Sequence, residues 1–540
     1  MKLRPFLAVV TAVALLLLSL AAGGWWLLLR QSPLALQNHS LQLPAAARFV
    51  PRNAPLSLHL QIAPDRAVAY ARAVAPPRQR RQAAAAIERL RDGAFAAAGL
   101  DYGAELASWI GDDLSVALLD APGESAPGWV LALASRDGEG ARNFLQRFWQ
   151  TRSLAGTDLQ ISSYRGMGLI SGRGALLGQR PQPLATALID DDLVLIASGR
   201  IVLEQALDVS QINELNQAGS PALRQQIERL GPGIALVMAR GEPLASWLGL
   251  PPSLAAVSPL RDLVASVVPS GAGLLLQADL GGEGPLPAGS AADLLPLLAS
   301  LRGSPESVLL AANPAGLLQA VGGTEPSWGA LVGTLLSQGL ADLGGGLPAL
   351  LARSDTGPFL LARQPAGWLA GTPSDQPSPQ QLEPALAAEG FLEAPLEAKG
   401  HELMVWTRLE ARPVKGDPDQ LLASLAGARS LQDGQAWWGE GLGVLEDQWG
   451  GSPDATARFD QLQALASPGA PLQWALAQAP ARSLLGGWQP WRLLSGLAGA
   501  PFSETVKGLA FSLEVPAASP GSGGDEPASQ LRLRARLALG

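Results

Sequence analysis

The chain has 540 residues, of which 47% are hydrophobic, a formal net charge of −8 and no cysteine. The acidic balance argues against a nucleic-acid partner, and the lack of cysteine excludes disulfides, thiol catalysis and thiolate metal ligands. The hydrophobic content supplies material for a core, so the chain is not disordered as a whole. Its length predicts more than one domain-sized unit.

An uncharged apolar run, Phe6–Leu29, follows Lys2 and Arg4 near the start of the chain. As a helix this run is about 36 Å long, enough to span the hydrocarbon core of a bilayer. Trp25 and Trp26 lie near its end and are typical of the membrane interface. The positive-inside rule predicts a cytoplasmic N-terminus and a body across the membrane. We therefore expect a single-pass membrane anchor.

A cleavable signal peptide is the alternative, with Ser19-Leu20-Ala21 as its cleavage site. The apolar run resumes after Ala21 and continues to Leu29, which favours an uncleaved anchor. A cysteine-free exported protein fits a bacterial envelope or a lumenal compartment. We expect the inner or thylakoid membrane, with the body in the periplasm or the thylakoid lumen.

Beyond the anchor, landmarks recur at a spacing of roughly 240 residues, which suggests a tandem duplication. A strand, a turn, a proline and a helix follow one another four times, and a Gly-containing turn and a Val-Leu-Glu sequence each occur twice. The paired landmarks are Pro64 with Pro314, Gly166 with Gly400, Glu204 with Glu446, and Pro243 with Pro480. Between them, the strand-like 128–133 of the first half is matched with 359–361 of the second. Chance similarity in a chain rich in Ala and Leu is the alternative.

Four segments are predicted, with the boundary between the halves in the Gly/Pro-rich stretch at 281–290. They are a cytoplasmic tip and transmembrane anchor at 1–30, a stalk at 31–48, a first half at 49–283 and a second half at 284–540. Strand-like runs are mixed with amphipathic helices without strict alternation. This pattern predicts an α+β fold with mainly antiparallel sheets and flanking helices.

Histidine-dependent chemistry has little support, because His39, His59 and His401 are the only histidines. His401-Glu402 begins like a zinc-protease helix, but the position that needs the second histidine is Val405. No lysine follows a glycine as a phosphate-binding loop requires, and there is no Gly-x-Ser-x-Gly elbow. We predict no catalytic residue and no cofactor.

Two carboxylate clusters are the candidates if a metal binds: Asp112 with Asp113, and Asp190 with Asp191 and Asp192. Each precedes an apolar strand, the second at 193–197. Neighbouring carboxylates can share a proton or hold a divalent cation. Acidic residues also favour turns at strand entries, and neither cluster has the ligand spacing of a calcium loop. The turn interpretation is therefore favoured.

Tryptophan is abundant, with 15 in the chain, and two pairs are candidates for partner binding. They are Trp437 with Trp438 and Trp488 with Trp491. Tryptophan is enriched at interface hot spots, although core packing is the alternative. A groove between the two halves is a further expected site for a ligand or partner.

Several arginines flank and enter a helix predicted over 83–98. They are Arg78, Arg80, Arg81, Arg89 and Arg91. Because Glu88 and Asp92 are interspersed, a solvated helix face with local ion pairs is favoured. Contact with anionic headgroups is the alternative.

Four features together carry a resemblance to a known family. They are the N-terminal apolar run, the Pro-Arg-Asn-Ala-Pro-Leu lead at 51–56, Leu-Ala-Ser-Trp-Ile-Gly at 106–111, and Tyr-Arg-Gly at 164–166. The chain resembles a cyanobacterial family of N-terminally membrane-anchored exported proteins of unknown function. The resemblance implies location and architecture and supplies no activity.

Three functions are compatible with these patterns. The first is a non-catalytic binding or assembly module with an envelope or lumenal protein partner. The second is a carrier of an apolar small molecule such as a lipid or pigment. The third is a carboxylate- or metal-dependent hydrolase that uses the two aspartate clusters. The sequence favours the first.

Overall fold

The computed structural model describes residues 32–540 except for short gaps. The gaps are 121–126, 154–158, 177–179, 242–243, 285–293, 324, 344–345, 378, 412–420, 451–455, 468, 499–502 and 517–528. The expected anchor Phe6–Leu29, with Trp25 and Trp26, lies outside the described residues. Within the described chain, no helix is long and apolar enough to cross a membrane.

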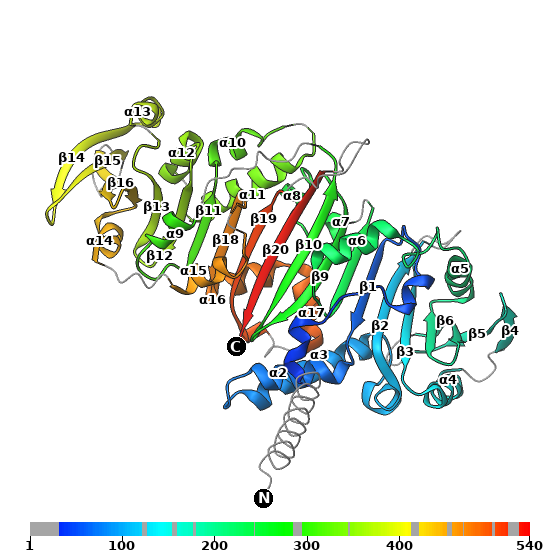
Figure 1. The fold of residues 1–540 in the computed structure, drawn as a ribbon. Helices are drawn as coiled ribbons and strands as arrows, with labels where there is room; N and C mark the ends of the chain where they lie inside the picture. Colours follow the sequence, from blue (N-terminus) through cyan, green and yellow to red (C-terminus); the bar gives the residue numbers. More distant parts are fainter. Residues whose placement is uncertain are drawn as a thin grey trace, which may run out of the picture.

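One antiparallel sheet of 20 strands runs through the whole molecule (Figure 1). The first ten strands, in chain order, are β1 (Leu56–Gln61), β2 (Ile110–Leu119), β3 (Gly128–Ser135), β4 (Gln160–Tyr164), β5 (Met167–Gly174), β6 (Gln182–Ile189), β7 (Leu193–Ala197), β8 (Ala235–Arg240), β9 (Leu260–Ser270) and β10 (Gly273–Gly282). The second ten are β11 (Ser307–Ala311), β12 (Phe359–Gln364), β13 (Gly367–Pro373), β14 (Phe391–Ala398), β15 (His401–Ala411), β16 (Leu421–Gln432), β17 (Gln435–Gly439), β18 (Leu472–Ala477), β19 (Val506–Glu514) and β20 (Ser529–Leu539).

The same strand order occurs twice. From one edge to the centre the neighbours are β4, β5, β6, β7, β3, β2, β1, β8, β9 and β10. From the centre to the other edge they are β20, β19, β18, β11, β12, β13, β17, β16, β15 and β14. Adding ten to each strand number of the first half reproduces every pairing of the second. This repetition supports the duplication hypothesis, and the exact boundary at 283/284 stays a prediction.

The strand topology changes one predicted equivalence. The strand β3 corresponds to β13, so the partner of 128–133 is 367–373, not 359–361. Both strands begin with Gly-Trp, at Gly128-Trp129 and Gly367-Trp368. The sequence comparison matched β3 with β12 instead of β13, because short apolar runs resemble one another in a chain rich in Ala and Leu.

Helices cover both sides of the sheet, and the α+β prediction is confirmed. One side, the α5 face, is covered by η2 (Ala45–Phe49), α5 (Arg200–Ser210), α6 (Pro221–Leu230), α9 (Leu295–Ala299), α14 (Leu442–Gly450) and α15 (Thr456–Gln463). The opposite side, the α3 face, carries α2 (Pro64–Val74), α3 (Arg80–Ala97), η3 (Tyr102–Leu106), α4 (Gly138–Arg152), α7 (Leu244–Trp247), α8 (Pro252–Ala255), α10 (Pro314–Gln319), α11 (Trp328–Leu343), α12 (Gly346–Ser354), α13 (Pro379–Ala388), α16 (Gln478–Gly487) and α17 (Gln489–Ala498).

The segment expected to be a stalk belongs to the body, so that prediction is wrong. The short helix η1 (Pro33–Asn38) buries Leu36 against Ile62 and Tyr70. Further on, Leu41 packs with α6 and β8, and Ala46 of η2 packs with α5. The physical reason is that these apolar side chains stabilise the fold when they leave water. A solvated stalk would leave them exposed.

The two halves join where β10 pairs with β20. Their register places Asp279 opposite Arg532. The Arg532 Nε donates to Asp279 Oδ1 over 2.9 Å, and the side chains are 19% and 2% exposed. The second oxygen, Asp279 Oδ2, is buried without a hydrogen-bond partner. A single ion pair therefore compensates a buried carboxylate at the centre of the sheet.

Helices reinforce this junction on the α3 face in a reciprocal way. From the first half, α3 packs on α17 of the second, with Arg89 Nε donating to the Ala498 carbonyl over 3.3 Å. From the second half, α11 packs on α8 of the first, with Gln338 Nε2 donating to Ser253 Oγ over 2.9 Å. The helices α3 and α11 hold the same place in the repeat. The expected groove between the halves is thus filled on this face by packed helices.

We predict that Arg532→Met destabilises the protein by about 3 kcal/mol, because it leaves a buried carboxylate unpaired. Adding Asp279→Leu should recover most of this loss, since removing both charges also removes the desolvation cost. Urea unfolding of the full-length protein measures both effects. Arg536→Met is the matched control, because Arg536 projects from the same side of β20 and has no ion pair among the described residues. Equal losses from the two single variants would contradict the prediction.

Candidate functional site

The helices α16 and α17 carry the clearest exposed apolar surface near a pocket. Leu484 is 48% exposed, Trp488 37%, Leu493 65% and Leu494 43%. We call these four residues the α16–α17 apolar set. Large apolar side chains gathered on a surface mark interaction sites more often than single exposed leucines do.

The pattern of the two helices explains why these side chains face outward. On α17, Trp491 and Ala498 are buried and belong to the main core, and they lie seven residues apart on one helix face. On α16, Ala481 and Leu485 are buried in the same way, four residues apart. Because each helix already buries one apolar stripe, the apolar set occupies positions outside these stripes.

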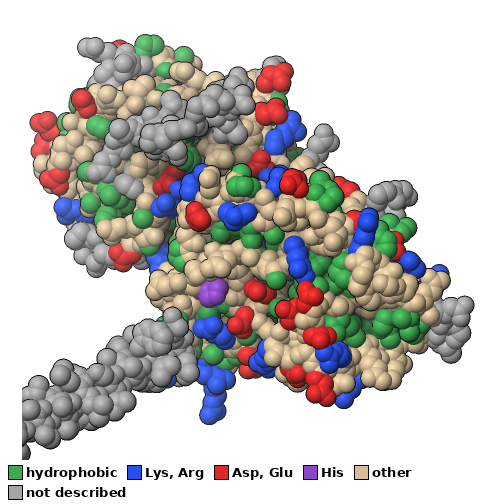
Figure 2. All heavy atoms as spheres, turned by 45° about the vertical axis from the view of Figure 1, so that its right-hand side comes forward, with side chains coloured by type: hydrophobic (Ala, Val, Ile, Leu, Met, Phe, Trp, Pro, Cys, Tyr) green, Lys and Arg blue, Asp and Glu red, His purple; other side chains and the backbone are tan. Residues whose placement is uncertain are grey.

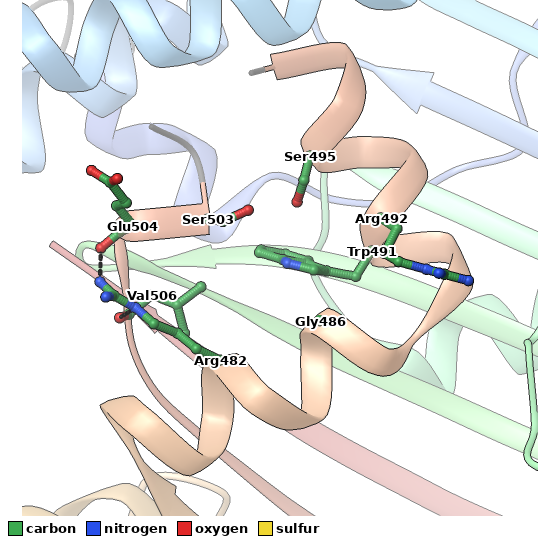
Figure 3. Close-up of a pocket in the computed structure, with 8 residues that line it drawn as sticks. All are labelled: Arg482, Gly486, Trp491, Arg492, Ser495, Ser503, Glu504 and Val506. Atoms are coloured by element: carbon green, nitrogen blue, oxygen red, sulfur yellow. Dashed lines mark hydrogen bonds between the residues drawn. The ribbon is translucent and has the colours of Figure 1, made fainter. Parts of the chain in front are cut away.

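A cavity of about 270 Å³ lies between α16, α17 and the segment that leads into β19 (Figure 3). Its lining residues are Arg482, Gly486, Trp491, Arg492, Ser495, Ser503, Glu504 and Val506. Figure 3 shows the Trp491 indole reaching into this space, with the hydroxyls of Ser495 and Ser503 directed toward it from two sides. The Ser495 hydroxyl is buried and has no hydrogen-bond partner.

Three charged residues line this cavity, and one of them, Arg482, is engaged with the backbone. Arg482 donates through Nε to the Val506 carbonyl over 3.2 Å and through Nη2 to the Glu504 carbonyl. The lining also offers a face of the Trp491 indole, the hydroxyls of Ser495 and Ser503, and the side chains of Arg492 and Glu504. Typical small-molecule pockets measure about 300–1,000 Å³, so this cavity suits a group the size of an amino-acid side chain. A whole lipid or pigment does not fit.

The four predicted tryptophans separate into buried and surface residues. Trp437 and Trp438 are 1% and 2% exposed, so an exposed patch at this pair is wrong. They lie on β17, between β13 and β16, where both sides of the sheet are covered. Trp438 also stacks on Trp406 with 5.0 Å between ring centroids. Trp488 is 37% exposed, whereas Trp491 is 6% exposed, belongs to the main core and lines the cavity. Partner binding at them stays a prediction.

The cluster at Asp190, Asp191 and Asp192 forms a turn between β6 and β7. Asp190 and Asp191 have φ angles of 47° and 60°, which place both in the left-handed region that a type I′ hairpin needs. Each is also paired with an arginine: Asp190 with Arg48 at 3.2 Å, and Asp191 with Arg142. This geometry supports the turn interpretation, with the carboxylates already matched by cations.

The other cluster lies at an irregularity of β2. The register with β3 shifts between Ile110 and Leu114, and Asp112 and Asp113 occupy this bulge. Burial raises the pKa of Asp113, and the charge of Asp112 raises it further. Across the part of the chain that is described, no three His, Cys, Asp or Glu side chains are grouped to hold a metal.

A buried network of hydrogen bonds on β1 was not predicted from the sequence. His59 is 0% exposed, its Nδ1 lies 2.7 Å from Ser115 Oγ, and its Nε2 lies 3.1 Å from Gln217 Oε1. The Gln217 amide nitrogen donates to Ser57 Oγ over 3.0 Å. This assigns the proton of His59 to Nε2, so that the Ser115 hydroxyl donates to Nδ1.

A serine that donates to an imidazole is the geometry of an activated nucleophile. Here Ser115 is 2% exposed and Gln217 is 3% exposed. A substrate therefore has no route to the hydroxyl in this structure. Burial lowers the pKa of His59 to about 4, against the opposing hydrogen bond to Gln217. The network is neutral at pH 7 and serves to satisfy polar groups inside the sheet.

A second buried ionisable group follows α12. Asp355 is 0% exposed, and its Oδ1 accepts a hydrogen bond from the Gly357 amide over 2.8 Å. Its Oδ2 has no partner. Burial raises the pKa of Asp355 to about 6, and the nearby charge of Asp375 contributes in the same direction.

The fold and the site define an α+β protein built on a repeated antiparallel sheet, with an exposed apolar surface beside a small tryptophan-lined cavity. The chain belongs to the family described as "Protein of unknown function (DUF3352)", which matches residues 10–509. No curated protein matches this chain.

Among solved structures, crystal forms III and I of TP0453 are similar to parts of the chain. Form III has 10% identity and a TM-score of 0.27 over 45% of this chain and 82% of that one. Form I has 10% identity and a TM-score of 0.28 over 45% and 81%. These scores are too low to carry an argument about fold or function.

We predict that His59 makes the free energy of unfolding decrease at acidic pH. Its folded-state pKa lies below the usual value of 6.5, so its contribution is complete above about pH 6.5 and is lost as the pH falls toward 4. The loss should be about 3 kcal/mol. Urea unfolding between these pH values should show this slope in the wild type and not in His59→Gln. His401→Gln, at a half-buried ring stacked on Trp449, should keep the slope, and its loss there would contradict the assignment.

Asp355 should make the stability of the protein depend on pH in the opposite direction to His59. Its folded-state pKa is raised from 3.8 to about 6. The contribution of Asp355 to stability is therefore highest below about pH 4, falls as the pH rises to 6, and then stays low. Asp355→Asn should therefore be more stable than the wild type at pH 8 by about 3 kcal/mol, with the gain vanishing near pH 4. Thermal unfolding at both pH values measures this. Asp375→Asn is the control and should give a much smaller gain.

Proposed function

We propose that the protein is a single-pass, membrane-anchored extracytoplasmic protein that works by binding a protein partner and not by catalysis. The anchor is the Phe6–Leu29 run, and the body lies in the periplasm or the thylakoid lumen. The observation that carries the proposal is the α16–α17 apolar set beside the Trp491 cavity. The cyanobacterial origin suggested by the sequence remains part of the proposal.

The size and chemistry of this surface favour a protein partner. Interface hot spots commonly consist of an apolar or aromatic side chain held in a small pocket and surrounded by weaker contacts. A cavity of about 270 Å³ with an indole surface can accept one such side chain. The exposed leucines then supply the surrounding apolar contact, and the Ser495 hydroxyl offers one hydrogen bond.

The two other functions have less support. A carrier of a lipid or pigment needs a larger enclosure than the cavity at Trp491. A hydrolase would rely on carboxylates, but Asp190 and Asp191 are held in a turn and paired with Arg48 and Arg142. The remaining pair, Asp112 and Asp113, lies on β2 without a third acidic or histidine ligand among the described residues.

The test uses the absence of native cysteine, so that one introduced thiol is unique. Leu493→Cys carrying a photocrosslinker, in the full-length protein in its native membrane, should give one discrete adduct. Adding Leu494→Asp should weaken that adduct at least tenfold, because a charge in an apolar hot spot is poorly tolerated.

Matched controls come from β4, where Ile161 is 81% exposed at the far edge of the sheet. Ile161→Cys should give no comparable adduct, and Ile161→Asp should leave the adduct from position 493 unchanged. Equal adducts from positions 161 and 493, or an adduct indifferent to Leu494→Asp, would rule out this surface as the binding site.

A further inference from the structure

A group of arginines at the end of α2, in the following loop and at the start of α3 has no acidic partner among the described residues. Arg72, Arg78, Arg80 and Arg81 are exposed, and none of them forms an ion pair in the described part of the chain. We call these four residues the α2–α3 arginine surface. No Asp or Glu occurs in the sequence from residue 66 to 87. Arg80 only donates through Nε to the Ala75 carbonyl over 3.5 Å.

This arrangement changes the earlier expectation for the arginine-rich helix. Local ion pairs form at Arg91, which contacts Asp65 and Asp92 over 2.6 and 2.8 Å. They do not extend to the first turn of α3. The beginning of the helix therefore carries an uncompensated positive charge, in a protein whose net charge is −8.

The arginine surface lies where the chain enters the body. The helix η1 packs on the last part of α2: Leu36 lies in one cluster with Tyr70 and Val74, and Gln37 Nε2 donates to the Tyr70 hydroxyl over 2.9 Å. A short loop at 75–79 then leads from the end of α2 into α3. The helix α2 therefore contacts both η1 and α3, which places the arginine surface near the point where the described chain begins (Figure 1).

The sequence places the end of the expected anchor close to this point. Only residues 30 and 31 separate Leu29 from Ser32, the first described residue. Three peptide steps reach at most about 10 Å. Leu34, in η1, is 47% exposed. Figure 2 shows Lys and Arg side chains projecting from the lower edge of the body on the face it presents.

We propose that the α2–α3 arginine surface docks on anionic lipid headgroups of the bilayer that holds the anchor, and so fixes the orientation of the body. The inference rests on the anchor of the proposed function. Guanidinium groups match phosphate geometry with two parallel hydrogen bonds. Basic side chains within a Debye length of an anionic bilayer are attracted to it. The short connection keeps the surface within this range.

The experiment uses the full-length protein in nanodiscs of phosphatidylcholine, with and without phosphatidylglycerol. Gln79→Cys, an exposed position within the surface, carries a donor dye, and the lipid headgroups carry the acceptor. Glu397→Cys, exposed on β14 at the far end of the molecule, is the reference position. Energy transfer from position 79 should be high with phosphatidylglycerol, fall with salt, and exceed that from position 397.

The variant Arg78→Gln with Arg81→Gln should reduce the docked-to-undocked ratio about thirtyfold, at roughly fivefold for each arginine near an anionic surface. Neither side chain has a described partner, so folding should be unaffected. Arg224→Gln with Arg229→Gln on α6 is the matched control: both arginines are exposed, and the charge change is the same. This control should keep the docked-to-undocked ratio of the wild type.

Energy transfer that ignores lipid charge, or an equal loss in the α6 control, would overturn the docking proposal. Co-migration of the protein with nanodiscs is measured first and separates the two proposals. If the protein does not co-migrate, the anchor itself is wrong. If it co-migrates without lipid-dependent transfer, the anchor stands and only the docking surface fails.

Discussion

The pairing of β10 with β20 is the constraint on which the rest of the structure depends. Each half alone is a ten-stranded sheet whose inner edge would present a row of free backbone groups, and such edges template aggregation. Pairing the two edges removes both at once and makes a single sheet. The Asp279–Arg532 ion pair marks the register of this junction. A slip by one residue would turn every side chain of β20 to the opposite face.

Burial inside this sheet does not follow the polarity of the side chains, and β1 shows why. Its alternation predicts a leucine face in the core, yet Ser57 and His59 are 0% exposed while Leu58 is 38% exposed. The reason is that helices cover the side of Ser57 and His59 completely, whereas the opposite side is left partly open at Leu58. The face toward α5 and α6 encloses His59 with Ser115 and Gln217, so the polar groups satisfy one another. Alternation therefore identifies the strand but does not determine which of its sides is buried.

Local sequence patterns therefore predicted where strands occur better than they predicted which side chains are buried. The strand at Leu193–Ala197 has the same bounds in the structure as in the prediction, because a short apolar run after a turn of aspartates has one simple interpretation. The α+β class followed from the same reasoning. The burial of Trp437 and Trp438 could not be predicted, since it depends on pairing with β13, which is distant in sequence, and on the helices that cover both sides of the sheet. The His59 network likewise needs Gln217, which lies 158 residues away. The free arginines at the start of α3 were visible in the sequence, but their lack of partners was not.

The long separation of the central strands also bears on how the protein is made. Asp279 and Arg532 are 253 residues apart in the chain. Translation at about 5–20 residues per second delivers β20 some ten to fifty seconds after β10. Throughout that interval the first half has an open inner edge, where a strand from another molecule can pair with it. The strand β20 thus protects the middle of the sheet, although it is made long after β10. Conditions that stall synthesis between these two strands would expose this edge and favour assembly between chains.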